Sequence, residues 1–414
     1  MFTEAFDIDE SLLSYGSIKA SWAQVGQAAP IYGTNETFST FNAGSGFLAD
    51  GITFPFQGIT GLGLSNQLPG LDLEPQNNTT IELGTELSFF GDRLNVEYTW
   101  YRENAINQIF AVPTASSSGF TTHLRNAGEL QNTGHEVMAN IRPIQTLDFQ
   151  WDLTLNFAQN TSEVIELAPG VDNIFIGGFV DPNIRAMEGF SYPIIFGSAY
   201  LRDDDGNIVY NSNPDDPNYG YAMTDPDLQS VGNVSPDWTG SITNRFNYRN
   251  IGLSFMFDIR QGGEMWSGNT RLQKLYGMDA KTEDRETPRV PSGVKGFIND
   301  AGDLVVEGPN DIEILKDQNY WLHEDLITES NVYDTSFIRL RQLTVSYNLT
   351  REQFSWLPTS SAELYFTGRN LLLFTDYPNW DPETNLGGDS NFQGLEYVNM
   401  PGTRSYILGV RLSI

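Results

Sequence analysis

The stretch that decides the fold is FIRLRQLTVSYNL, residues 337–349 of a 414-residue chain. From Gln342 onward, apolar and polar residues alternate without interruption. The apolar set is Leu343, Val345, Tyr347 and Leu349, and the polar set is Gln342, Thr344, Ser346 and Asn348. Alternation with a period of two predicts a β-strand that has one apolar and one polar face.

Nine further segments carry the same alternation, some of them less regularly. The ten predicted strands are residues 17–25, 81–89, 94–100, 134–141, 147–157, 239–248, 253–259, 337–349, 362–374 and 404–414. The clearest of them reach the ~9–11 residues that a tilted strand needs to cross the hydrocarbon of a bilayer, whereas strands of soluble proteins average about 5–6 residues. The fold class we expect is therefore all-β: an antiparallel transmembrane β-barrel.

The connections between these segments alternate between short turns and long polar loops. Bacterial outer-membrane barrels show this asymmetry, with short turns in the periplasm and long loops outside the cell. Ten strands of this kind predict a portion of a barrel with long extracellular loops, including residues 158–236 and 261–333.

Composition narrows the possible functions. The chain has 53 acidic and 23 basic residues, a net charge of -30, which makes nucleic acid an unsuitable partner. It has no cysteine, so disulfides and thiolate metal sites are excluded. No run of 18 apolar residues occurs, which excludes transmembrane helices.

The residues that could carry catalysis or bind metal form no recognisable site. His123, His135 and His323 lack the spacing of metal ligands, so we expect no metal centre and no enzyme activity. The segment LRDDDGNIVYNS (201–212) has Gly206 where a calcium loop needs glycine, but Leu201 and Ser212 occupy the first and twelfth ligand positions. We expect a solvated acidic turn here, with an irregular Ca²⁺ site as the alternative.

Short motifs occur in a fixed order along the chain. NAGELQNTGHE (126–136) is followed by PDWTG (236–240), FIRL (337–340), GRNL (368–371) and DPE (381–383). Their characteristic positions are Asn126, Gly128, Asn132, Gly134, Glu136, Pro236, Asp237, Arg339, Leu340, Asn370, Leu371, Asp381, Pro382 and Glu383. In residues and order they resemble the motifs of SusC/RagA-type TonB-dependent outer-membrane transporters.

This resemblance implies an importer of bulky nutrients, such as glycans or peptides, in the outer membrane of a Bacteroidetes-like Gram-negative bacterium. It implies a SusD-like surface lipoprotein that caps the barrel as a lid, and the TonB complex, which supplies energy through an N-terminal part. Such transporters have about 22 strands and a plugged lumen. No plug, TonB box or signal peptide is recognisable here, so we expect residues 1–414 to be the C-terminal part of the barrel, unable to transport by itself.

Two groups of aromatic residues are candidates for binding. Tyr98, Trp100, Trp151, Tyr347 and Tyr406 lie on apolar strand faces, where we expect them at the membrane interface or against lipid. Trp266, Tyr276, Tyr320, Trp321 and Trp380 lie in predicted loops, several beside acids or amides, a setting that suits sugar rings and peptide side chains. The alternative for the loop group, and the more common role of any one such residue, is to pack the loops together or to rest against the lid.

Two other functions remain open from the sequence. A soluble all-β carbohydrate-binding or glycan-processing protein would also have strands joined by loops rich in Gly, Asp and Trp, but it requires two sheets packed face to face with shielded apolar side chains. A passive porin would need neither plug nor lid.

Overall fold

The computed structural model describes residues 12–40, 42–43, 52–351, 354–355 and 359–413. The start of the chain, where no signal peptide was recognised, and Ile414 of the last predicted strand lie outside these residues.

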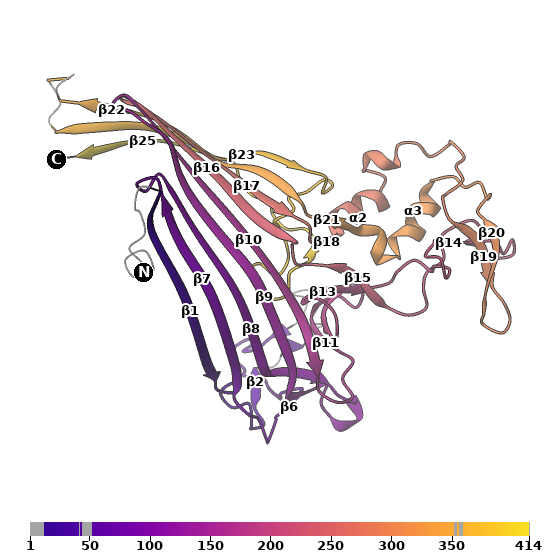
Figure 1. The fold of residues 1–414 in the computed structure, drawn as a ribbon. Helices are drawn as coiled ribbons and strands as arrows, with labels where there is room; N and C mark the ends of the chain where they lie inside the picture. The colour runs from indigo at the N-terminus through magenta and orange to yellow at the C-terminus, as the bar shows by residue number, and fades with distance from the viewer. Residues whose placement is uncertain (1–11, 41, 44–51, 352–353, 356–358, 414) are drawn as a thin grey trace.

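The fold is organised by one large antiparallel sheet, curved like part of a barrel wall (Figure 1). Its ten long strands are the ten predicted ones in the predicted order, so the fold class is confirmed. In sheet order they are β1 (Leu13–Gln27), β7 (Gln76–Phe89), β8 (Leu94–Pro113), β9 (Thr122–Gln145), β10 (Phe149–Leu167), β16 (Trp238–Tyr248), β17 (Ile251–Gln261), β22 (Phe337–Thr350), β23 (Ser361–Thr375) and β25 (Ser405–Ser413). The short β6 (Gln67–Leu68) adds a parallel pair with β9. The sheet is not closed: among the described residues β1 pairs only with β7, and β25 only with β23.

Several strands are longer than predicted, and three of them extend by ten residues or more. β8 continues to Pro113, β9 begins at Thr122, and β10 continues to Leu167, so the long polar loop expected between residues 100 and 134 is wrong. Only residues 114–121, including η1 (Ser116–Ser118), connect β8 to β9. Apolar alternation requires apolar surroundings on one face. Where these strands project beyond the exposed apolar band, apolar residues are clustered, as in IFAV (109–112), and pack in a buried cluster with Val164 and Leu167. The regular alternation that marks a strand is therefore lost.

The other long connections fold into compact structure at one end of the sheet, and we call residues 168–237, 262–336 and 376–404 the loop lobe (Figure 1). It contains three small sheets: β11 (Asn173–Gly178), β12 (Asn183–Met187), β13 (Ile194–Gly197) and β15 (Gln229–Asn233); β14 (Val209–Asn211), β19 (Val294–Ile298) and β20 (Leu304–Pro309); and β21 (Val332–Asp334), β18 (Glu264–Ser267) and β24 (Leu395–Glu396). Its helices are α2 (Gly268–Leu275), α3 (Gln318–Asp325), η2 (Ala280–Thr282) and η3 (Thr328–Asn331). The first long loop carries β2 (Phe38–Thr40) paired with β5 (Leu62–Leu64), and β3 (Asn42–Ala43) paired with β4 (Ile52–Thr53).

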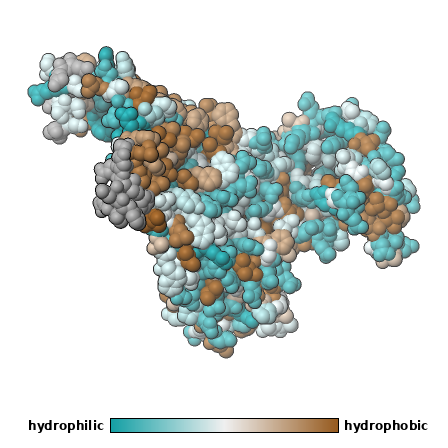
Figure 2. All heavy atoms as spheres, in the orientation of Figure 1, coloured by the Kyte–Doolittle hydropathy of each residue, from teal (hydrophilic) through white to brown (hydrophobic). Residues whose placement is uncertain are grey.

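Buried apolar side chains are concentrated in and beside the loop lobe, for example around Ile184, Ile195 and Trp266. The apolar face of the large sheet remains exposed, as shown by Leu408 at 84% and Val345 at 45%. Figure 2 shows apolar residues gathered over the region of β16, β17, β22 and β23. No second sheet packs on this face among the described residues, which contradicts the soluble alternative. No helix in the described part of the chain is both long and apolar enough to cross a membrane.

Candidate functional site

The face opposite the apolar one is polar, and we call it the polar wall. Strand register aligns Glu97, Asn156, Ser241, Asp258 and Arg339 in one row across β8, β10, β16, β17 and β22, with Met138 of β9 between Glu97 and Asn156. Residues in register on neighbouring strands point to the same side of a sheet. The row is therefore continuous over six strands.

A hollow of about 500 Å³ lies in the polar wall. Glu97 and Glu136 line it on one side and Asp258 on the other, and the small Ala158 and Gly240 lie between them. Glu136 is a motif position, and the register places it opposite Thr99 and Ala158. Glu97 pairs with Lys19 and Asp258 with Arg341, so Glu136 is the carboxylate of the hollow without an ion pair among the described residues. The hollow is therefore suited to a polar group.

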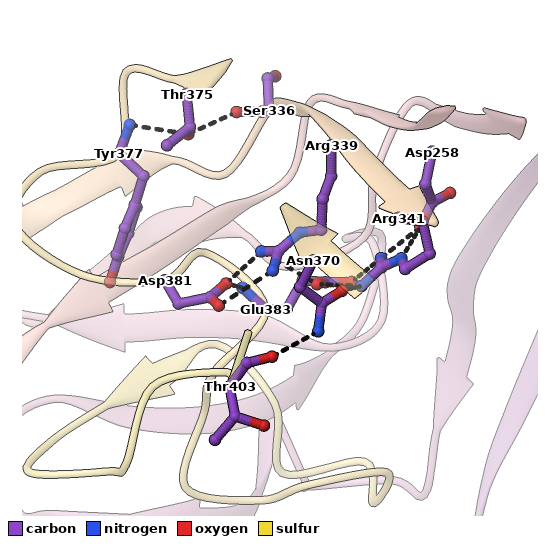
Figure 3. A network of polar contacts seen from close by, with 10 residues as sticks. All are labelled: Asp258, Ser336, Arg339, Arg341, Asn370, Thr375, Tyr377, Asp381, Glu383 and Thr403. Carbon is purple, nitrogen blue, oxygen red and sulfur yellow. Dashed lines mark hydrogen bonds and ion pairs between the residues drawn. The ribbon is translucent and has the colours of Figure 1, made fainter. Parts of the chain in front are cut away.

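An ion-pair cluster links the polar wall to the last long loop (Figure 3). The Arg339 guanidinium donates two hydrogen bonds to the Asp381 carboxylate, at 2.6 and 3.2 Å, and lies 3.1 Å from Glu383. Arg341 donates to both oxygens of Glu383, at 2.6 and 2.9 Å, and also pairs with Asp258. We call these five residues the arginine cluster.

Two bulges explain how both arginines reach one face. Arg341 is an extra residue of β22 relative to β17, because Leu340 pairs with Phe257 and Gln342 with Met256. β23 has its own extra residue at the same level, where Asn370 has a positive φ of 52°. A bulge re-aims the side chains beside it. Arg339 and Arg341 therefore meet the same carboxylate, although a strict alternation continuing upstream from Gln342 would place them on the apolar face.

The cluster brings together motif positions that are distant in sequence. Arg339, Asn370, Asp381 and Glu383 come from three motifs, and the Asn370 side chain also donates to the Thr403 carbonyl at 3.0 Å. Leu340 and Leu371 flank the bulges, and Pro382 is buried between the two acids. Sequence reasoning missed Asp258 and Thr403, because each looks like an ordinary polar position. The motifs thus fasten residues 376–404 to the polar wall.

The motif NAGELQNTGHE (126–136) also fixes a loop, the first long one, to the large sheet. The Asn126 side chain accepts from the Glu74 backbone amide at 2.8 Å and donates to the carbonyls of Glu74 and Asn107, at 2.9 and 2.7 Å. Asn126 therefore holds the end of the first long loop against β8 and β9. Gly134 leaves room for the ring of Tyr101, since a Cβ there would lie 2.4 Å from it.

The remaining motif positions are structural as well. Gly128 faces the Phe110 ring, and Asn132 pairs across strands with Glu103 and Ser162. At the second motif, Pro236 and Asp237 precede β16, and the Asp237 amide donates to the Gln261 carbonyl at 2.9 Å. The Asp237 carboxylate packs against Gly262, where φ is 73° and a Cβ would approach to 2.5 Å.

The five strand aromatics lie on the apolar face. Tyr98 and Trp100 lie in the first half of β8, which begins after the short turn at residues 90–93, and the Tyr98 hydroxyl is 2.9 Å from Nδ1 of His135. Trp151 and Tyr347 are near the short turns, and the Trp151 indole donates to Asn244 at 3.0 Å. Tyr406 is exposed on β25. Their role at a membrane interface stays a prediction.

The five loop aromatics are not brought together. Trp266 is 2% exposed and packs against Phe179 and Tyr397, and the rings of Tyr320 and Trp321 pack edge to face in a buried cluster. These three follow the alternative role of packing the loops. Trp380 is half-buried, and only Tyr276, at 72%, presents an open ring.

Two buried ionisable groups lie in the loop lobe. The Lys274 ammonium donates to the Ser330 carbonyl at 3.1 Å and lies 5.8 Å from the ring centres of Trp321 and Tyr333. Burial lowers the pKa of Lys274 to about 8. The Glu396 carboxylate accepts from Ser267 Oγ at 2.8 Å, and burial raises its pKa.

The acidic segment 201–212 forms a tight turn. Asp203 Oδ1 accepts from the backbone amides of Asp205 and Asn207, at 3.1 and 2.8 Å. Among the residues the structure describes, no group of three or more His, Cys, Asp or Glu side chains is arranged to hold a metal ion.

Comparison with known proteins gives consistent matches to one class of protein. No protein-family model matches the chain. The chain is 25% identical, over its whole length, to TonB-dependent receptor P3 of Formosa agariphila, and the alignment covers 40% of that receptor. It is 20% identical to the TonB-dependent receptor SusC of Bacteroides thetaiotaomicron, with 99% of the chain and 38% of SusC aligned.

Solved structures show the same fold. The RagAB peptide importer in the open-open state matches with a TM-score of 0.68 and 19% identity, over 100% of this chain and 42% of that chain. The RagAB peptide transporter matches with a TM-score of 0.67 and 18% identity, over 99% of this chain. The chain spans about 40% of the length of the curated relatives it matches.

Proposed function

Because this chain is a partial barrel of a SusC/RagA-type TonB-dependent receptor, we propose that it forms the C-terminal wall and outer loops of an importer of bulky nutrients. The protein is an outer-membrane receptor, and its role is transport, not catalysis. The observation that carries the proposal is the two-faced sheet, with an exposed apolar side and a continuous polar side.

The free edges support the proposal that residues 1–414 are one part of a larger barrel. Unpaired backbone groups in hydrocarbon cost several kcal/mol each, so a membrane-spanning sheet must close on itself. β1 and β25 each leave one edge unpaired among the described residues. Further strands that pair with β1 and β25 would satisfy both edges.

The partners follow from the family. RagAB is a complex described as a peptide importer, which supports a SusD-like lipoprotein as the lid of this receptor and a peptide or glycan as its cargo. TonB would supply energy through the N-terminal part. Tyr276 is the loop aromatic best placed for contact with cargo or lid, because its ring is open to solvent.

Growth of the native host tests this function. Deletion of the full-length gene should abolish growth on at least one oligosaccharide or peptide source, and the intact gene should restore it. A gene that lacks residues 405–413 should fail to restore it, because β23 then loses its pairing with β25 and keeps only its pairing with β22. Unchanged growth of the deletion strain on every bulky source, with normal growth of a control strain, would contradict the proposal.

A further inference from the structure

A second hollow lies between the arginine cluster and the last long loop, and we call it the loop pocket. Its volume is about 440 Å³, within the ~300–1,000 Å³ of small-molecule sites. Four residues of the arginine cluster and Asn370 form one side (Figure 3). Residues from the segments 384–389 and 399–402 form the other side. The pocket therefore lies where the loop meets the strands β22 and β23.

The cations of the loop pocket are already paired. Its lining includes two guanidinium groups and the carboxylates of Asp381, Glu383 and Asp389. The guanidinium groups, those of Arg339 and Arg341, are both hydrogen-bonded to carboxylates of the arginine cluster. An anionic ligand would have to compete with these carboxylates for the same donors. The pocket is therefore poorly suited to an anion.

Three polar side chains on the loop side of the pocket have no partner in the described part of the chain. They are the hydroxyl of Thr384, the side-chain amide of Asn385 and the carboxylate of Asp389. Oδ1 of Asn385 is buried as well as unpaired. A buried acceptor without a donor is unfavourable. A ligand that brings hydrogen-bond donors into the pocket could satisfy it.

The backbone beside the pocket is held in an uncommon conformation. Val398 has a φ of 57°, which is a genuine outlier for a β-branched residue. The next residue, Asn399, lines the pocket, donates to the Asn385 carbonyl at 3.2 Å and accepts from the Tyr397 amide at 3.2 Å. Strained backbone persists where the surroundings fix it, and it is concentrated at ligand sites. These contacts hold the two loop segments together on one side of the pocket.

We propose that the loop pocket binds a sugar residue of the cargo. Sugar hydroxyls both donate and accept hydrogen bonds, which matches the free hydroxyl of Thr384 and the free acceptors of Asn385 and Asp389. Met400 is the one apolar side chain of the lining, whereas most ligand pockets are predominantly hydrophobic. The apolar side chains of a peptide would find almost no contact area here. The inference rests on the proposed function for the role of the ligand as cargo, and it selects a glycan over a peptide.

Binding assays with the purified full-length receptor test this site. The probes are a panel of neutral oligosaccharides and a panel of peptides of similar length. We expect at least one oligosaccharide to bind, and Asn385→Ala and Asp389→Ala each to weaken that binding about five- to tenfold, as the loss of one hydrogen bond does. Asp376→Ala is the matched control and should bind like wild type, because Asp376 is an exposed carboxylate of the same loop outside the pocket.

Melting temperatures separate ligand contact from a structural role. The side chains of Asn385 and Asp389 have no partner within the described residues, so both variants should melt with wild type. Unchanged oligosaccharide affinity in both variants, binding of peptides alone, or no binding of any oligosaccharide would overturn the sugar site. The importer proposal would stand in each case if deletion of the gene still abolished growth on a bulky source. Growth independent of the gene would refute the importer and leave the pocket to be judged by its binding.

Discussion

At the residue scale, Arg339 is the charge on which the arginine cluster most depends. It is 4% exposed, and Asp381 is buried beside it. Arg339→Gln would leave Asp381 without its closest cation, and breaking a buried pair typically costs about 3–5 kcal/mol. We expect a clear drop in the melting temperature of the full-length receptor and in its abundance in the outer membrane.

Arg411→Gln is the control for this prediction. Arg411 also pairs with a carboxylate on the adjacent strand, Glu363, but its side chain is exposed. Loss of an exposed pair costs about 0–1 kcal/mol. Equal destabilisation by the two substitutions would show that burial of the Arg339 pair does not determine its contribution.

Because Lys274 is buried, we expect the stability of the loop lobe to depend on pH. Its folded-state pKa is about 8, below the ordinary 10.5, so between these values the unfolded chain binds more protons than the folded one. Stability should therefore rise with pH across this window, by at most about 1.4 kcal/mol per pH unit from this group. Below about pH 8 the penalty of burying the charge is complete.

Lys274→Met should remove this dependence. The melting temperature of Lys274→Met relative to wild type should be highest near pH 7.5 and should decline toward pH 9.5, because the wild-type lysine becomes neutral. Lys295→Met, which replaces a lysine of the same lobe whose pKa is raised by its hydrogen bond to Asp311, should show no such trend. If the difference in melting temperature between Lys274→Met and wild type does not change with pH, the pKa of Lys274 is not lowered by burial.

At the scale of the element, the sequence was most informative where one face of a strand is apolar. Alternation located all ten strands of the large sheet, because lipid-facing and polar-facing positions must differ. It missed the outer halves of β8 and β9, where apolar residues such as those at 109–112 do not alternate with polar ones. It also could not show the paired bulges at Arg341 and Asn370. A bulge is defined by how two neighbouring strands pair, and the sequence of one strand does not contain that information.

The arginine cluster was predictable in part from the sequence. Motif resemblance singled out Arg339, Asn370, Asp381 and Glu383, but only the fold brings them together with Asp258. The loop aromatics were less predictable, since burial of Trp266 and Tyr320 depends on packing between loops that are distant in sequence.

Asn126 gives a prediction about one loop. Its three hydrogen bonds to Glu74 and Asn107 hold the first long loop against the beginning of β9. Asn126→Ala should speed amide exchange near Glu74 about tenfold or more, since each net bond contributes about 1 kcal/mol. Asn104→Ala is the control, because Asn104 contacts side chains only. Unchanged exchange in Asn126→Ala would show that other contacts hold this loop.

At the scale of the whole molecule, the free edges limit how the barrel can close. All nine pairings between the ten long strands are antiparallel, so β1 and β25 run in opposite directions. Any strands inserted between them in an antiparallel barrel must be even in number. In the proposed larger barrel, the wall described here would keep its own pairing unchanged.

The central claim is that the apolar face of the large sheet contacts lipid, and site-directed spin labelling measures this directly. This chain contributes no cysteine, so single cysteines at residues 344–347 of the full-length receptor can be labelled selectively, provided the rest of the receptor has none. In outer-membrane vesicles, labels at Val345 and Tyr347 should be accessible to oxygen in the bilayer, and labels at Thr344 and Ser346 should not. Equal accessibility at all four positions, or the reverse alternation, would contradict the account.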